Sequence, residues 1–172
     1  MTSELSLPVD SALALARRCA AAMWADDRAS RRLGMQLMAV APGRSTLSMT
    51  VREDMVNGHG SCHGGFIAAL ADSAFAFACN TYDEVTVAAG FDITFVAPAR
   101  LGDELVADAV ERSRFGRSGL YDVTVSCHRG ADDTVIAEFR GRSRSLGRPH
   151  LPTQGVDPNR VDPQQHVDTS TP

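Results

Sequence analysis

The sequence has few cysteines and no long hydrophobic run, and each shortage argues against a class of protein. Its four cysteines among 172 residues are scattered without a Cys-x-x-Cys pair, so reduced thiols in the cytoplasm are the simplest interpretation. No stretch approaches the ~20 apolar residues of a membrane helix. The apolar segment near the N-terminus is interrupted by Arg17 and Arg18 and follows acidic residues, which disfavours a signal peptide.

An excess of basic charge is also missing. The net charge is −4 at pH 7, which argues against a general nucleic-acid binder. Apolar residues make up 44% and charged residues 22% of the chain, fractions that are typical of a globular protein. A chain of this length fits one domain with a sizeable core.

Hydrophobic periodicity predicts one amphipathic helix over 11–28, with apolar residues at helical spacing. A second, almost entirely apolar helix is predicted over 64–80. Alternation of apolar and polar residues predicts six strands, over 35–40, 46–52, 85–95, 105–109, 121–128 and 135–144.

Short turns between consecutive strands favour antiparallel pairing. One apolar face per strand, together with a single hydrophobic helix, predicts an α+β fold in which an antiparallel sheet wraps around that helix. We expect one domain over 1–146. The remaining segment, 147–172, is rich in Pro, Gln, Asp, Thr and Ser and is expected to be a disordered tail.

A glycine-rich polar turn over 57–65 leads directly into the second helix, which carries one carboxylate, Asp72, among apolar residues. A buried, unpaired carboxylate is costly because desolvation penalises its charged form, so Asp72 is a candidate functional residue. A structural role, in which Asp72 caps a neighbouring loop, is the alternative. The free N–H groups at the start of the helix could stabilise a developing negative charge.

The spacing of these two features predicts a dimer. Gly64 and Asp72 are eight residues apart, which places them about 12 Å apart along one helix. A nucleophile and an oxyanion donor that serve one carbonyl must each lie about 3 Å from it, so one chain cannot supply both. Two copies with antiparallel central helices could, and they would share two sites about a two-fold axis.

Three adjoining segments resemble the hotdog-fold acyl-CoA thioesterases of the phenylacetate-degradation (PaaI) type: Asn57-Gly58-His59, Ser61-Cys62-His63-Gly64-Gly65 and Leu70-Ala71-Asp72-Ser73-Ala74. Further matches are Phe95-Val96-Ala97-Pro98-Ala99 and Gly119-Leu120-Tyr121-Asp122-Val123. The resemblance covers about 10–146.

The resemblance implies a thioesterase that hydrolyses aryl-type thioesters such as phenylacetyl-CoA or hydroxyphenylacetyl-CoA. No metal or organic cofactor is implied, and the expected assembly is a homodimer or a dimer of dimers. Asp72 would be the nucleophile or general base, and Gly64 would supply the backbone oxyanion donor. His63 and Asn57 would position the thioester and the carboxylate. Sister branches carry a serine where this chain has Ala88, so that role is absent or moved here.

Substrate contacts are expected from Gly65, Ser73, Phe66, Arg114 and Arg117. The Ser73 hydroxyl could hold the charge of Asp72, and Phe66 either lines an acyl pocket or fills the core. The two arginines suit the phosphates of coenzyme A, or they belong to a solvated face of the sheet.

Three other interpretations stay open. Cys62, beside His63 and just before the helix, could itself be the nucleophile. His59, Cys62 and His63 suggest zinc, but their spacing matches no common structural zinc signature. The fold also hosts acyl-thioester hydratases and dehydratases, and a non-catalytic acyl-CoA-binding protein is the third alternative.

Overall fold

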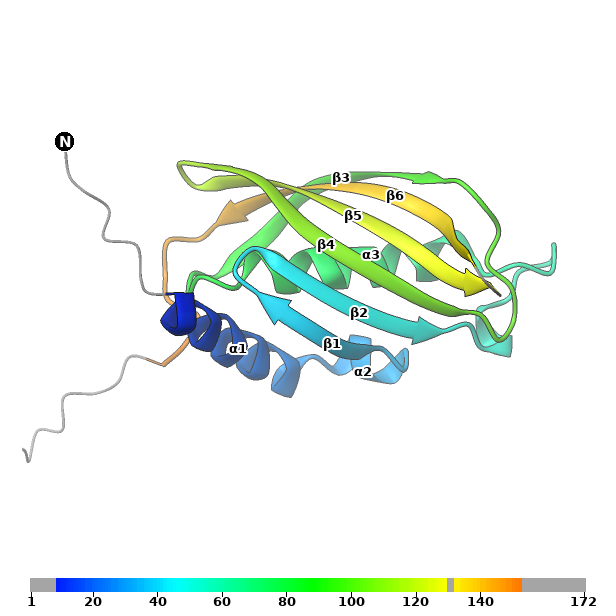
Figure 1. Cartoon of the computed structure of the whole chain (residues 1–172), viewed down its shortest axis with the longest axis horizontal. Coiled ribbons are helices and arrows are strands. Elements are labelled where there is room, and N and C mark those ends of the chain that lie inside the picture. The colour runs from blue at the N-terminus through cyan, green and yellow to red at the C-terminus, as the bar shows by residue number, and fades with distance from the viewer. Residues whose placement is uncertain (1–8, 130–131, 153–172) are drawn as a thin grey trace, which may run out of the picture.

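The computed structural model describes residues 9–129 and 132–152. Six antiparallel strands form one sheet in the order β1-β2-β4-β5-β6-β3, and the sheet curves around helix α3 (Figure 1). The helices are α1 Val9–Asp26, α2 Arg28–Arg32 and α3 Gly64–Cys79, with a short 3-10 turn at Glu53–Met55. The strands are β1 Gln36–Ala41, β2 Arg44–Thr50, β3 Thr86–Phe95, β4 Glu104–Phe115, β5 Ser118–Arg129 and β6 Asp132–Ser145. This architecture confirms the α+β prediction.

Helix α3 is the centre of the hydrophobic core. Its Leu70, Ala74 and Phe75 are fully buried, and the helix packs against the inner faces of β2, β4 and β5. The inward residues of the strands, such as Leu47 and Val123, are also fully buried. The expected second helix over 64–80 is therefore present almost residue for residue, because nearly every α3 side chain is apolar.

The helix expected over 11–28 is two helices. The backbone of Asp27 is extended, and its carboxylate accepts a hydrogen bond from the N–H of Ser30 at 2.9 Å. An Asp in this position caps a new helix, so α1 ends at Asp26 and α2 begins at Arg28. Helix α1 packs against β1, and its Trp24 ring lies 5.7 Å from the ring of Phe77 on α3.

β3 lies at an edge of the sheet and does not pair with the strand that follows it in sequence. β3 pairs with β6 rather than with β4, the next strand in sequence. The connection from β3 to β4 is anchored to β6 at its start, where the N–H groups of Val96 and Ala97 donate to the carbonyl of Ile136. It is anchored to the end of β2 where Val51 exchanges backbone bonds with Gly102 and Asp103. The connection thus crosses from one edge of the sheet to its middle.

The packed chain continues past the expected domain boundary at residue 146. The backbone N–H groups of His150 and Leu151 both donate to the carboxylate of Asp83, at 3.0 and 2.7 Å, and Leu151 is buried. The rest of the expected tail, 153–172, lies outside the described residues. Among the described helices, none is long and apolar enough to cross a membrane.

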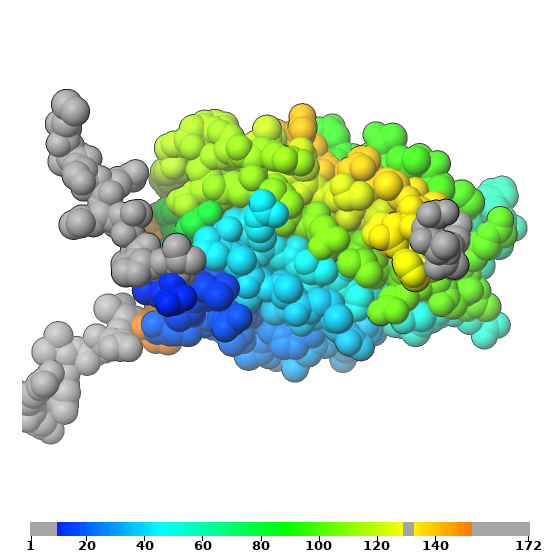
Figure 2. Space-filling model, in the orientation of Figure 1, coloured from blue at the N-terminus to red at the C-terminus, as the bar shows by residue number. Residues whose placement is uncertain are grey.

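Charged side chains pair with one another on the outer face of the sheet. Figure 2 shows the side of the molecule on which β4 and β5 lie. Asp122 pairs with Arg112 at 2.8 Å and with Arg140 at 2.6 Å, and Arg142 pairs with Asp92 at 2.5 Å. Exposed pairs of this kind contribute little to stability, because solvent screens the charges. Arg112, Arg140 and Arg142 therefore belong to a solvated face of the sheet.

Candidate active site

The loop before α3 is held together by the side chain of Asn57. Its Oδ1 atom accepts hydrogen bonds from the backbone N–H of His59 at 2.8 Å and of Ser61 at 3.3 Å, and from the Ser61 hydroxyl at 3.3 Å. The backbone N–H of Asn57 also donates to the Ser61 carbonyl at 2.8 Å. Asn57 thereby fixes the backbone that leads into the helix, and its expected contact with the thioester stays a prediction.

His63 caps the N-terminus of α3. Its Nδ1 atom accepts a hydrogen bond from the N–H of Gly65 at 3.1 Å, which satisfies one of the free donors of the first turn. Because Nδ1 is the acceptor, the proton of a neutral ring lies on Nε2, which can donate to a ligand. The ring is exposed, and it lies edge-on to Phe66 with 6.4 Å between ring centroids.

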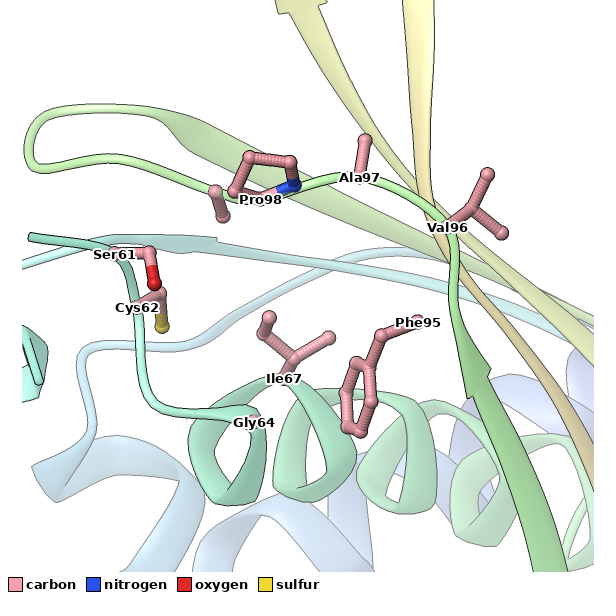
Figure 3. Close-up of a pocket in the computed structure, with 9 residues that line it drawn as sticks. Ser61, Cys62, Gly64, Ile67, Phe95, Val96, Ala97 and Pro98 are labelled. Atoms are coloured by element: carbon pink, nitrogen blue, oxygen red, sulfur yellow. The ribbon is translucent and has the colours of Figure 1, made fainter. Parts of the chain in front are cut away.

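The N–H of Gly64 is available as a donor. It belongs to the first turn of the helix, where an N–H group has no acceptor within the helix. Among residues 9–129 and 132–152 the structure shows no other acceptor for this N–H. Gly64 borders a pocket of about 410 Å³ that Cys62, Ile67 and residues 95–99 also line (Figure 3). A Cβ atom at Gly64 would lie 2.8 Å from Cζ of Phe95, so glycine permits this close approach.

Asp72 lies in the middle of α3 with an unsatisfied carboxylate oxygen. Its Oδ1 atom is buried and has no hydrogen-bond partner among the described residues. Burial raises the pKa of Asp72 above its ordinary value, because desolvation disfavours the charged form. Such an orphaned buried acceptor is rare in a folded protein and requires an explanation.

Gly64 and Asp72 are not brought together within one chain, because both belong to the continuous helix Gly64–Cys79. About 12 Å of helix separates them. The half-exposed side of the helix that carries Asp72 is otherwise built of small residues, with Ala68, Ala69 and Ala76 at helical spacing. A second helix can approach such a surface closely.

The Ser73 hydroxyl contacts a residue that the sequence did not single out. Its Oγ atom lies 3.0 Å from Oγ of Ser30 on α2, and this pair leaves Asp72 without a bond from Ser73. Ser30 is a short polar residue in a helical segment, and only the packing of α2 onto α3 identifies it. No local sequence signal could have found it.

Arg114 and Arg117 lie at the opposite end of α3 from Gly64, around a small polar pocket that includes Cys79. The Arg114 guanidinium lies 3.9 Å above the centroid of the Tyr82 ring, and its Nη2 atom is 4.0 Å from Oε2 of Glu84. Arg117 donates through Nε and Nη2 to the Ser145 carbonyl. Both arginines are therefore ordered by contacts within the chain, and their expected contact with phosphates stays a prediction.

The aromatic residues of α3 divide between core and surface. Phe75 and Phe77 are fully buried and belong to the core, whereas Phe66 is half-buried beside His63. Phe66 packs against the edge of the core, and its expected contact with the acyl group stays a prediction.

Cys62 is a poor candidate for the nucleophile. Burial raises the pKa of its thiol, whereas a reactive cysteine needs a lowered pKa. All four cysteines are buried and unbridged. Within the described part of the chain, no three His, Cys, Asp or Glu side chains gather where they could hold a metal ion.

Comparison with known proteins identifies the family. The thioesterase superfamily profile matches residues 59–132. The acyl-coenzyme A thioesterase PaaI of Escherichia coli is 38% identical over 126 residues, which are 73% of this chain and 88% of that protein. A putative esterase of Deinococcus radiodurans is 39% identical over 109 residues, 63% of this chain and 73% of that protein.

Solved structures agree with this result. The structure of the Escherichia coli PaaI protein superposes with a TM-score of 0.76 at 36% identity, covering 80% of this chain and 97% of that one. A variant of the phenylacetic acid degradation protein PaaI from Thermus thermophilus gives a TM-score of 0.65 at 35% identity, covering 70% and 100%. The chain therefore belongs to the PaaI-type family of hotdog-fold acyl-CoA thioesterases, and it is a thioester hydrolase.

Proposed function

We propose that this enzyme hydrolyses arylacetyl-CoA thioesters, such as phenylacetyl-CoA or hydroxyphenylacetyl-CoA, at two sites that two copies of the chain build together. One observation carries the proposal: a buried, unpaired carboxylate oxygen on Asp72 and a free N–H on Gly64 lie on the same helix. They are too far apart to serve one carbonyl. Each is therefore half of a site, which the second copy completes.

The edge of the sheet supports this assembly. β3 is an edge strand of ten residues, and its Val87, Phe91 and Phe95 are 44%, 41% and 51% exposed. A long edge strand with exposed apolar side chains invites pairing with another chain. We propose that β3 and the small-residue side of α3 face the same elements of a second copy. The dimer of dimers implied by the family resemblance stays a prediction.

In this arrangement the thioester carbonyl accepts the hydrogen bond of the Gly64 N–H from one copy, while Asp72 of the other copy faces the carbonyl carbon. As general base, Asp72 takes a proton from water while the water oxygen bonds to that carbon. The C–S bond then breaks, the proton passes to the departing CoA sulfur, and a carboxylic acid and CoA remain. As nucleophile, the Asp72 carboxylate would instead bond to the carbonyl carbon and displace the CoA thiolate, and water would then split the resulting anhydride into the free acid and the Asp72 carboxyl group.

The chemistry of a thioester suits this small set of groups. A thiolate leaves without a strong general acid, so a carboxylate and an oxyanion donor suffice without a full triad. The Nε2–H group of His63, at the start of the same helix, is available to orient the thioester. We infer the arylacetyl class from the family and from Phe95, whose ring lies against Gly64.

Coenzyme A would extend away from this centre. In an antiparallel pair of helices, the end of α3 in one copy approaches the start of α3 in the other. Arg114 and Arg117, at the end of α3, would then lie on the second copy's side of the site. We propose that they bind the phosphates. The cytoplasmic location expected from the reduced cysteines is part of the same proposal.

The experiment is a panel of arylacetyl and straight-chain acyl-CoA thioesters, assayed for thiol release with a chromogenic disulfide. We expect the arylacetyl thioesters to be hydrolysed fastest and Asp72→Asn to be inactive on all of them. Asp108→Asn, a change at an exposed carboxylate on β4, is the matched control and should retain full activity. A change in enoyl absorbance without free thiol would instead indicate a hydratase, and binding without turnover a non-catalytic protein.

A further inference from the structure

The polar pocket at the end of α3 is lined by two arginines and three serines, which all offer hydrogen-bond donors. These residues are Arg114, Arg117, Ser118, Ser143 and Ser145. Among the described residues that line the pocket, the acidic one is Glu84. Two guanidinium groups against one carboxylate leave a net positive charge, so the pocket suits an anion better than a neutral group.

The carboxylate of Glu84 lies between two of these donors. Its Oε1 atom accepts a hydrogen bond from the hydroxyl of Ser145, a residue that is 5% exposed. Its Oε2 atom lies 4.0 Å from Nη2 of Arg114. A phosphate group accepts the same kinds of hydrogen bond, from hydroxyl and guanidinium groups. The carboxylate of Glu84 therefore fills a position that the oxygen atoms of a phosphate could take.

The Arg114 guanidinium is held by its flat face rather than by a tight ion pair. It lies 3.9 Å above the centroid of the Tyr82 ring, and its distance of 4.0 Å from Glu84 is too long for a hydrogen bond. By contrast, Arg140 contacts Asp122 at 2.6 Å on the outer face of the sheet. Stacking leaves the N–H groups at the edge of a guanidinium able to donate. Arg114 is therefore oriented for an anion to which Glu84 is not hydrogen-bonded in its stead.

The polar pocket has no room for a phosphate group while Glu84 stays in it. Its free volume is about 20 Å³, which is about the space that one water molecule needs. The backbone beside Glu84 is fixed, because the carboxylate of Asp83 accepts hydrogen bonds from the N–H groups of His150 and Leu151. The Glu84 side chain itself is 38% exposed, and exposed side chains change rotamer rapidly. It can therefore leave the pocket without a movement of the backbone.

We propose that Glu84 is an internal competitor for CoA: its carboxylate occupies the place of one CoA phosphate group, rotates away when CoA binds and returns when CoA leaves. The phosphate must replace contacts that Glu84 already makes with Ser145 and Arg114, which lowers the net affinity. The enzyme thereby binds CoA less tightly and releases this product faster. This inference rests on the proposed function, because it needs Arg114 and Arg117 to bind the phosphates of CoA.

The test compares the wild type with Glu84→Gln, which keeps the size of the side chain and an acceptor for the Ser145 hydroxyl but removes the charge. Calorimetry measures the Kd of CoA, which should fall about fivefold in Glu84→Gln. Thiol release measures kcat/KM for a pantetheine thioester of the acyl group that the panel shows to be hydrolysed fastest. This substrate carries no phosphate, so its kcat/KM should not change. The Kd of dephospho-CoA, which keeps only the diphosphate, identifies the phosphate group that enters the pocket.

Glu138→Gln is the matched control. Glu138 also accepts a hydrogen bond from a hydroxyl, that of Thr124 at 2.9 Å, but it is exposed on the outer face of the sheet, so its change should leave the Kd of CoA unaltered. A Kd of CoA that stays the same or rises in Glu84→Gln would overturn the inference. So would equal effects on CoA and on the pantetheine thioester, which would assign Glu84 a role in the fold.

Arg114→Ala separates this inference from the proposed function. It should weaken CoA binding about tenfold, the effect of a lost hydrogen bond to a charged group. An unchanged Kd would show that the phosphates bind elsewhere, and would overturn both the proposed place of CoA and the role of Glu84. An enzyme that hydrolyses other acyl-CoAs but no arylacetyl thioester would overturn only the proposed acyl class, because the binding of CoA itself does not depend on the acyl group.

Discussion

Asp72 places a charged group where the chain by itself cannot satisfy it. Its buried Oδ1 lacks a partner among the described residues, and desolvation raises the pKa of the carboxyl group. A neutral side chain of the same shape should suit the isolated fold better. This is the pattern expected where function is retained at the expense of stability.

Asp72→Asn should therefore be inactive but more stable. We expect kcat to fall by about 10²–10⁴-fold, the contribution of a positioned acid–base group. The unfolding midpoint at neutral pH should rise, by roughly 2–4 °C for each kcal/mol gained. Thermal unfolding and thiol release measure the two effects, and a variant that loses stability together with activity would indicate a structural aspartate.

The pH dependence of stability follows from the same shift. Because burial raises the folded-state pKa of Asp72, the folded state prefers the protonated form. The wild type should lose the corresponding stability as pH rises from the unfolded-state pKa, about 3.9, through the higher folded-state value. The stability advantage of Asp72→Asn should then shrink when unfolding is measured at successively lower pH, and a constant advantage would contradict this account.

The pH dependence of catalysis provides a separate measurement. Hydrolysis requires the carboxylate form of Asp72, so the acidic limb of kcat/KM should lie above the ordinary range of an aspartate. Kinetics across the acidic range measure the limb directly. If the acidic limb of kcat/KM instead gives the ordinary pKa of an aspartate, contacts from the second copy must offset the desolvation of the Asp72 carboxylate.

At the scale of elements, the start of α3 combines a helix cap with a candidate ligand donor. The Nδ1 atom of His63 accepts from the N–H of Gly65, and Nε2 remains available as a donor. His63→Ala should lose the cap and about 0.5–2 kcal/mol of stability. His63→Asn should restore much of that stability, because Asn caps helices well, but it should not restore kcat. Full activity in His63→Asn would limit His63 to capping.

The elements also show what local sequence determines. The apolar run of α3 and the alternating strands were predicted correctly, because burial in this fold follows local periodicity. The break at Asp27 was missed, because the helical pattern of α1 continues into α2 and only the capping bond to Ser30 divides them. The pairing of β3 with β6 could not be predicted from the sequence, because no local signal distinguishes an edge strand from its neighbours.

At the scale of the whole molecule, the glycine at residue 64 allows a precise test of the oxyanion donor. Gly64 is the first residue of α3 after the His63 cap. Proline is well tolerated at this position of a helix, but it has no N–H to donate. Gly64→Pro should abolish hydrolysis. Gly64→Ala presses a Cβ atom against the same Phe95 ring but keeps the N–H, so it should retain measurable activity. An equal loss of activity in both variants would show that displacement of the Phe95 ring, and not the missing N–H, lowers the activity.

The candidate site could be predicted from sequence to the extent that its residues lie within one motif. Asn57, His63, Gly64 and Asp72 fall in one loop and helix, and their spacing indicated that one chain is not enough. The contact between Ser30 on α2 and Ser73 on α3 joins segments far apart in sequence, which a linear pattern does not encode.

Mixing two inactive variants tests the shared site most directly. In a heterodimer of Asp72→Asn and Gly64→Pro, one site combines the intact Gly64 of the first chain with the intact Asp72 of the second. Random re-association should then restore about a quarter of wild-type activity, since about half of the dimers are mixed and each has one working site. A mixture that re-associates, as size measurements can establish, yet stays inactive would contradict a site built from two chains.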